Sequence, residues 1–254
     1  MYLKNILKLM LALLVILSCS DDDTTVDNSQ NIANRPSSCE NAVGYTGLYW
    51  DFANALPTGL SEVPMIQNPG QQFTHDLQPL LGFTMPQGFS GFEITDPQTQ
   101  TIGVDVIRND NQVIYRWIPS SSVIGQQIPS QEIIANEINN MFDFYGFNGT
   151  PEVPCTEFKQ QVFSTIPMEF NARLLRFDGR IAQFWVITTY AASSTYITLS
   201  VVTAPEAEYD AQVANTFLPI NFQLYVNENG GIVDNDNDGL DILRDPDDND
   251  PNVP

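Results

Sequence analysis

Aspartates near the C-terminus have the spacing of a cation-binding loop. Asp234, Asp236 and Asp238 stand at alternate positions, Leu240 can offer a main-chain carbonyl two residues later, and Asp245 ends a stretch of twelve residues. Calcium takes six to eight oxygen ligands, and a glycine at the sixth position lets such a loop turn so that alternate side chains point inward. A glycine stands at that sixth position here. These five residues therefore predict a calcium site.

The calcium-binding pattern is similar to two known kinds of loop. It resembles an EF-hand loop, but Asp241 stands where those loops carry a hydrophobic residue, and the loop ends in Asp rather than Glu. It is more similar to thrombospondin type 3 repeats, although these would have an aspartate at Ile242. Asp247 and Asn249 could belong to a second, incomplete site. The alternative is a disordered acidic tail, and because the aspartates repel one another, order in the tail should depend on calcium.

The N-terminus has the pattern of an export signal. Lys4 and Lys8 precede an apolar run over residues 9–17, which is shorter than the roughly 20 residues of a spanning helix. The run is therefore predicted to be the core of a signal peptide. The segment that ends at Cys19 resembles a bacterial lipobox, which implies that Cys19 is lipidated and becomes the first mature residue. An ordinary secretory leader is the alternative.

Acidic residues follow the predicted lipidation site directly. Asp21, Asp22 and Asp23 resemble the surface-export signal of Bacteroidota lipoproteins, which implies a location on the outer face of the outer membrane. A charged linker on a lipoprotein that faces the periplasm is the alternative. The polar composition of residues 19–38 predicts a flexible, disordered tether between the lipid and the domain.

Two further cysteines, Cys39 and Cys155, remain if Cys19 carries the lipid. Disulfides persist in exported proteins, so an even pair of cysteines is expected to be bonded. Two unpaired buried cysteines are the alternative. The sequence thus predicts one disulfide, between Cys39 and Cys155.

Strand and helix patterns alternate in the central part of the chain. The predicted strands are 83–89, 101–108, 112–118, 158–166, 169–177, 180–191 and 195–203. The predicted helices are 130–146, with Ser130 as its cap, and 204–217, with Thr203 and Glu206 in the spacing of a capping box. This order predicts an α+β fold, an antiparallel sheet with helices packed on it.

The central pattern also resembles a known family. Phe83-Thr84-Met85-Pro86 near its start, a turn at Gly179 and Tyr196-Ile197-Thr198-Leu199 near its end are similar to the PsbP-like family, which includes PsbP, the Mog proteins and DcrB-like lipoproteins. The resemblance implies an α/β/α sandwich over residues 83–226 that serves binding or assembly rather than catalysis. It assigns no functional residue.

Aromatic residues gather before this region. Tyr45, Tyr49 and Trp50 lie among glycines and prolines within residues 39–82, which predicts a loop-rich segment. These side chains are expected either to pack against the sheet or to form an exposed platform for a sugar or peptide ligand.

The composition narrows the function classes. The chain has 31 acidic and 10 basic residues and a net charge of -21, so nucleic acid is excluded as a partner because phosphate backbones would be repelled. His75 is the only histidine and is predicted to lie on a surface loop. Glycoside hydrolysis needs a carboxylate pair, which the sequence could supply only through the fold. The candidates are Glu93, Asp96, Asp105, Glu132 and Glu137.

The sequence therefore predicts five regions, namely 1–18 as signal peptide, 19–38 as tether, 39–82 as aromatic segment, 83–226 as PsbP-like domain and 227–254 as calcium-binding tail. The function that these regions favour is that of a non-catalytic surface lipoprotein of the outer membrane, which binds calcium and scaffolds an unknown protein or glycan partner. A carboxylate-dependent surface glycan hydrolase and a calcium-dependent adhesin or spacer are the alternatives.

Overall fold

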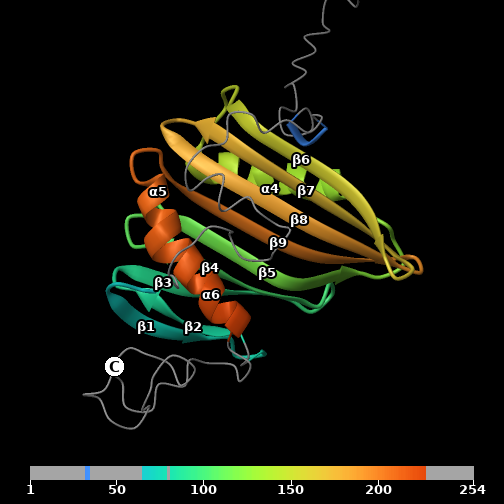
Figure 1. Cartoon of the computed structure of the whole chain (residues 1–254), viewed down its shortest axis with the longest axis horizontal. Helices are drawn as coiled ribbons and strands as arrows, with labels where there is room; N and C mark the ends of the chain where they lie inside the picture. The colour runs from blue at the N-terminus through green and yellow to red at the C-terminus, as the bar shows by residue number, and fades with distance from the viewer. Residues whose placement is uncertain (1–31, 35–64, 79–80, 227–254) are drawn as a thin grey trace, which may run out of the picture.

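A seven-stranded antiparallel sheet dominates the computed structural model, which describes residues 32–34, 65–78 and 81–226 (Figure 1). The strands lie in the order β3-β4-β5-β9-β8-β7-β6, and every neighbouring pair is antiparallel. Their bounds are β3 (Phe89–Asp96), β4 (Thr101–Arg108), β5 (Ile114–Val123), β6 (Glu152–Phe163), β7 (Ile166–Phe177), β8 (Arg180–Ala191) and β9 (Ser194–Pro205). A separate hairpin pairs β1 (Pro69–Thr74) with β2 (Gly82–Pro86).

The central strands are apolar on both faces, which explains their nearly continuous hydrophobic sequence. In β8, Phe184 and Val186 lie in the core on one face, whereas Ile181 and Trp185 lie in the core on the other. A strand with both faces covered has no polar face to alternate with its apolar one. The sheet therefore separates two hydrophobic cores.

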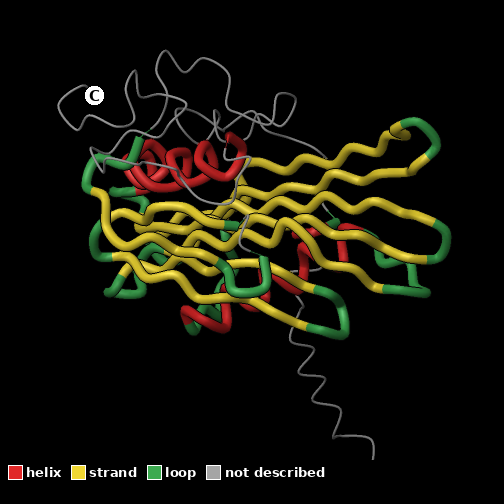
Figure 2. The backbone as a smooth tube through the Cα atoms, turned by 90° about the horizontal axis from the view of Figure 1, so that it is seen from below, coloured by secondary structure: helices red, strands yellow, loops and turns green. Residues whose placement is uncertain are grey.

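Helical segments belong to both cores (Figure 2). Helix α4 (Ser130–Tyr145) buries Ile134 and Ile138 on the β7–β8 side and ends at Gly146, whose φ of 65° closes the helix. A continuous segment contributes to the other core and begins at residue 209. It consists of α5 (Tyr209–Gln212), the π-helical turn η1 (Val213–Phe217) and α6 (Leu218–Val226).

The predicted α+β class, an antiparallel sheet with helices packed over it as an α/β/α sandwich, is wrong. More than half of the described residues lie in strands. Seven strands span about 29 Å across the sheet, since neighbours lie about 4.8 Å apart. A single helix about 10 Å wide cannot cover such a surface. The fold is a mostly β structure in which few helices lie against a large sheet.

Several predicted elements agree with the structure. The predicted strands 101–108 and 180–191 match β4 and β8 residue for residue, and the predicted helix 130–146 ends one residue later than α4. In β4 and α4 the period of the apolar side chains is unbroken, whereas β8 is a nearly continuous apolar run that follows the turn at Gly179.

Several other predicted elements are wrong in their limits, two of them because of a turn or a cap. The predicted strand 83–89 is divided, because Gly88, with a φ of 82°, turns the chain between β2 and β3. The predicted helix 204–217 begins instead at Tyr209, and its predicted cap, Thr203, lies inside β9. The Thr203 hydroxyl donates to the Ile181 carbonyl oxygen at 3.0 Å, so it is used within the sheet.

Candidate functional site

A buried arginine on β7 binds the N-terminal segment of the described chain. Arg173 is 1% exposed, and its Nε donates to the carbonyl oxygen of Ile32 at 2.9 Å, while Nη2 donates to that of Ala33. Nη1 donates to the carbonyl oxygens of Glu157, at 3.0 Å, and of Ala172, at 2.6 Å. Several carbonyl oxygens thus replace the water around this guanidinium, as a buried charge requires.

The segment held by Arg173 is part of the predicted tether. Ile32 is 2% exposed and Ala33 is fully buried, and both pack in the core that α4 shares with β7 and β8. The prediction of a disordered tether over residues 19–38 is therefore wrong at these positions. An isoleucine followed by an alanine offers apolar area to the core, and the two carbonyl groups offer acceptors to Arg173.

An open groove adjoins this segment where α4 begins. It has a volume of about 520 Å³ and is lined by Asn34, Pro129, Gln131, Glu132 and Asn136. Three of these residues carry amide side chains, which can both donate and accept hydrogen bonds, and one carries a carboxylate. The groove is therefore suited to a polar ligand.

A carboxylate from β7 fixes the first residue of α4 beside the groove. Glu169 Oε2 accepts hydrogen bonds from the Ser130 amide at 3.0 Å, from Ser130 Oγ at 2.9 Å and from Tyr190 Oη at 2.9 Å. The sequence predicted Ser130 as the N-cap of this helix, but Ser130 is the first helical residue and Pro129 occupies the N-cap position. A negative charge here also complements the positive end of the helix dipole.

The protonation of this cluster follows from its contacts. Burial alone would raise the pKa of Glu169, but the hydrogen bonds that its carboxylate accepts outweigh burial and lower the pKa. Burial and the adjacent Glu169 raise the pKa of Tyr190 to about 12. At neutral pH the carboxylate is therefore charged and the phenol protonated, which stabilises the helix start but leaves no group poised to exchange a proton.

The structure brings together two of the carboxylates proposed for glycan hydrolysis. Asp105 on β4 accepts two hydrogen bonds of 2.8 Å from Arg116, and Glu137 on α4 accepts one of 2.9 Å from the same guanidinium. Both carboxylates therefore balance one positive charge and join α4 to the sheet. Hydrolysis would instead need one carboxyl group protonated and the other ionised.

The other candidate carboxylates are separate from this pair. Glu93 on β3 pairs with Val104 on β4. It therefore projects from the same sheet face as Val104, which is opposite to the face of Asp105. Asp96 accepts hydrogen bonds from the Gln98 amide and the Thr99 hydroxyl in the turn after β3. Glu132 lines the groove.

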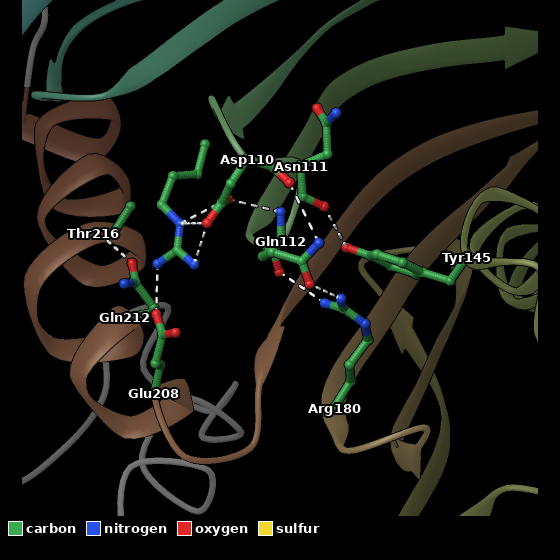
Figure 3. A network of polar contacts seen from close by, with 9 residues as sticks. Asp110, Asn111, Gln112, Tyr145, Arg180, Glu208, Gln212 and Thr216 are labelled. Carbon is green, nitrogen blue, oxygen red and sulfur yellow. Dashed lines mark hydrogen bonds and ion pairs between the residues drawn. The ribbon is translucent and has the colours of Figure 1, made fainter.

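Figure 3 shows a second polar network, at the opposite end of α4. Arg180 donates to the Gln112 carbonyl oxygen at 2.9 Å and lies 3.9 Å from the centre of the Tyr145 ring. Nearby, Arg108 pairs with Asp110 at 2.9 Å and with Glu208 at 2.5 Å. The network joins the β4–β5 turn to α4 and to the residue before α5, and its role is structural.

His75 is not the surface histidine that the sequence predicts. Its side chain is fully buried and lies edge-on to Phe73, with 6.5 Å between ring centres. Nδ1 accepts hydrogen bonds from the main-chain amides of Leu77 and Gln78, at 3.2 and 3.3 Å. The imidazole therefore stabilises the turn that follows β1.

Most of the predicted site residues lie outside the described residues, and their predicted roles stay predictions. They are Cys19, Cys39, Tyr45, Tyr49, Trp50, Asp234, Asp236, Asp238, Leu240 and Asp245. Cys155 is described and is fully buried on β6. Within residues 32–34, 65–78 and 81–226, no three His, Cys, Asp or Glu side chains gather as a metal site. No helix in the described part of the chain is long and apolar enough to cross a membrane.

The sequence signal for the Arg173 site lies in the alternation along β7. Leu175 and Phe177 share a face with Arg173 and are buried, so an arginine two residues before them must also enter the core. Nothing in that pattern indicates the residues that it binds.

Comparison with solved structures finds a likeness in fold. No family model and no curated protein matches the sequence. The fold is similar to the solution structure of cyanobacterial PsbP (CyanoP) from Synechocystis sp. PCC 6803, with 12% sequence identity over 67% of this chain and 97% of that one. The TM-score is 0.35, which leaves activity and partners undetermined.

Proposed function

We propose that this chain is a lipid-anchored protein of the outer-membrane surface whose sheet domain is a non-catalytic module that binds or scaffolds a partner. The observation that carries the proposal is the binding of Ile32 and Ala33 by Arg173. If Cys19 carries a lipid, thirteen residues, from 19 to 32, separate that lipid from the domain, and they span at most about 45 Å. The domain would therefore work close to the bilayer.

The groove at the start of α4 supports the binding role. Its amide side chains and Glu132 can recognise the hydroxyl or amide groups of a glycan or peptide. The hydrogen bonds of Glu169 fix one wall of this groove, because they hold the first residue of α4. A groove with a fixed wall loses little entropy when it binds a ligand.

The anchor is tested with the full chain and its Cys19→Ala variant, expressed in a bacterium that has an outer membrane. Wild type should be found in the outer-membrane fraction with a lipid mass on Cys19, and protease added to intact cells should cleave it. The variant should carry no lipid and should be absent from the outer-membrane fraction. An unmodified Cys19 would contradict the proposal, and protection from protease would place the protein on the periplasmic side.

The groove is tested by cross-linking in the same cells. A photoreactive residue at Asn136, which lines the groove, is compared with one at Asn140, one helical turn further along α4 and also exposed. The proposal predicts a discrete adduct from position 136 that is absent from position 140. The same adducts from both positions, or none from either, would show that the groove is not the binding site.

A further inference from the structure

Exposed apolar side chains gather at one end of the sheet. Among the described residues, eight large hydrophobic side chains are exposed, and five of them lie at or near the end where β5 finishes and the β6–β7 and β8–β9 turns are placed. The register sets these turns side by side, because Met168 on β7 lies opposite Thr189 on β8 (Figure 1). We call this group the apolar end; it consists of Ile124, Val162, Phe163, Ile166 and Tyr196.

The apolar end is almost free of charge in a strongly acidic protein. Residues 117–131 and 181–205 contain no charged side chain, and residues 158–168 contain one, Lys159. Glu169 is the next carboxylate along β7, and its hydrogen bonds direct it to the start of α4. The net charge of -21 therefore comes from other parts of the chain.

We propose that the apolar end inserts into the surface of a lipid bilayer. Val162 and Phe163 lie at the tip of a hairpin, and Phe163 is 72% exposed, so they can enter the acyl region without any change in the fold. Tyr196 and Lys159 lie a few residues further back, where an amphipathic ring and a long basic side chain, here paired with Glu157, suit the headgroup layer. A lipid surface is favoured over a protein because the tips of the β6–β7 and β8–β9 hairpins carry no carboxylate, which anionic headgroups would repel. Asp96, in the β3–β4 turn at the same end of the sheet, lies on the far side of β5 from these two tips.

The geometry of the chain allows this contact. Arg173 lies seven residues from Ile166 along β7, or about 23 Å. The thirteen residues between positions 19 and 32 reach up to about 45 Å, so an N-terminus in the bilayer leaves the apolar end free to touch the same membrane. A lipid anchor and an inserted apolar loop are the kind of two-part attachment that holds a protein stably on a membrane.

The test is photolabelling of the purified full chain mixed with phosphatidylcholine vesicles that contain a photoactivatable acyl chain. Trypsin cuts after Lys159 and Arg173 and releases the hairpin tip as one peptide. We expect this peptide to take up on the order of tenfold more label than Phe92, which is exposed elsewhere on the sheet. Trypsin leaves Phe92 in one peptide with the N-terminal leader, because it does not cut between Arg35 and Pro36, so the label at Phe92 is measured by fragment-ion sequencing of the peptide that ends at Arg108. The full chain of 254 residues keeps the apolar run over residues 9–17, which brings the domain to the vesicle whether or not Cys19 is lipidated.

A variant with Val162→Ser, Phe163→Ser and Ile166→Ser should also lose the label at Ile124, which it does not alter. The matched control, Phe92→Ser with Phe144→Ser, should keep the label at Ile124. An unchanged near-ultraviolet circular dichroism spectrum shows that both variants are folded. Unlabelled tips in wild type, or label at Ile124 that persists in the triple variant, would overturn the proposal. So would dimers of the wild-type chain, seen by sedimentation, that the triple variant abolishes without any lipid labelling.

Discussion

Arg173 Nε donates a hydrogen bond of 2.9 Å to the carbonyl oxygen of Ile32, which lies 141 residues earlier in the chain. The contact joins β7, the strand next to the β6 edge of the sheet, to the segment that leads back to the predicted lipid. Because the guanidinium is buried with its carbonyl acceptors, each partner depends on the other to replace lost water contacts. The N-terminal segment is thus part of the folded domain.

Replacing Arg173 with methionine should release this segment. The side chain keeps its approximate volume, but the carbonyl groups of Ile32, Ala33 and Glu157 lose their donor, which should lower the free energy of unfolding by about 2–4 kcal/mol. Chemical denaturation measures this loss. Thermolysin, which cuts before apolar residues, should cleave the variant at Ile32, whereas burial protects that bond in wild type.

The control for this variant is Arg176→Met, on the same strand. Arg176 is 37% exposed and pairs with Glu206 at 3.1 Å, and exposed pairs of this kind contribute less than about 1 kcal/mol. Equal losses of stability in the two variants, with Ile32 protected in both, would show that Arg173 does not hold the N-terminal segment.

The stability of the domain should fall in acid partly because of Glu169. Its pKa is lower in the folded protein than the ordinary value of 4.5, so below pH 4.5 the unfolded chain binds a proton more readily than the folded one. This contribution is complete above pH 4.5 and is lost as the pH falls through the folded pKa. Unfolding curves between pH 3 and 6 should show a shallower acid loss for Glu169→Gln than for wild type.

The Tyr190→Phe variant separates this effect from general acid unfolding. It removes one hydrogen bond to Glu169 while keeping the carboxylate, so it should destabilise the domain by about 1 kcal/mol and retain most of the pH dependence. Parallel pH curves for wild type and Glu169→Gln would show that another group causes the acid loss.

The pattern of apolar residues predicted correctly those strands and helices whose limits depend on their own side chains. Strand 101–108 and helix α4 follow from the periods of their apolar residues, and strand 180–191 follows from its nearly continuous apolar run. Prediction from the sequence failed where pairing with another strand decides the limits of an element. Cys155 belongs to a strand that starts at Glu152, before the predicted strand 158–166, because β7 offers a paired ladder that far along the sheet.

The candidate site was harder to predict than the fold, since its contacts join remote positions. Arg173 meets Ile32 and Ala33 in the core, and Glu169 reaches Ser130 across 39 residues. Alternation along β7 indicates that Arg173 is buried, but no local rule states which carbonyl groups it binds. The low charge between residues 181 and 205 was visible in the sequence, but only the register showed that the turn in the middle of this stretch shares one end of the sheet with the β6–β7 turn.

The predicted disulfide between Cys39 and Cys155 should be detected as a single cross-linked peptide under non-reducing conditions. Closing so long a loop should stabilise the domain by about 4 kcal/mol. Because either substitution breaks the same bond, Cys39→Ala and Cys155→Ala should lower stability to similar extents in oxidising buffer and should not differ from wild type by more than about 1 kcal/mol after reduction. Recovery of both residues as free thiols would contradict the pairing.

The calcium site in the tail is predicted from the sequence, because residues 227–254 lie outside the described residues. If Asp236 and Asp238 bind the same ion, calcium offsets their repulsion, and its binding free energy orders a segment that has few apolar residues. Extracellular modules of this kind bind calcium at about 0.1–1 mM, so calorimetry on the whole chain should show weak binding. The double variant Asp236→Ala, Asp238→Ala should abolish the heat of binding, whereas Asp248→Ala, which removes the same kind of charge outside the loop, should preserve it. Equal affinity in wild type and the double variant would show that Asp236 and Asp238 do not bind the ion. Equal weakening by Asp248→Ala and by a single substitution within the loop would show that the tail attracts calcium only through its overall charge.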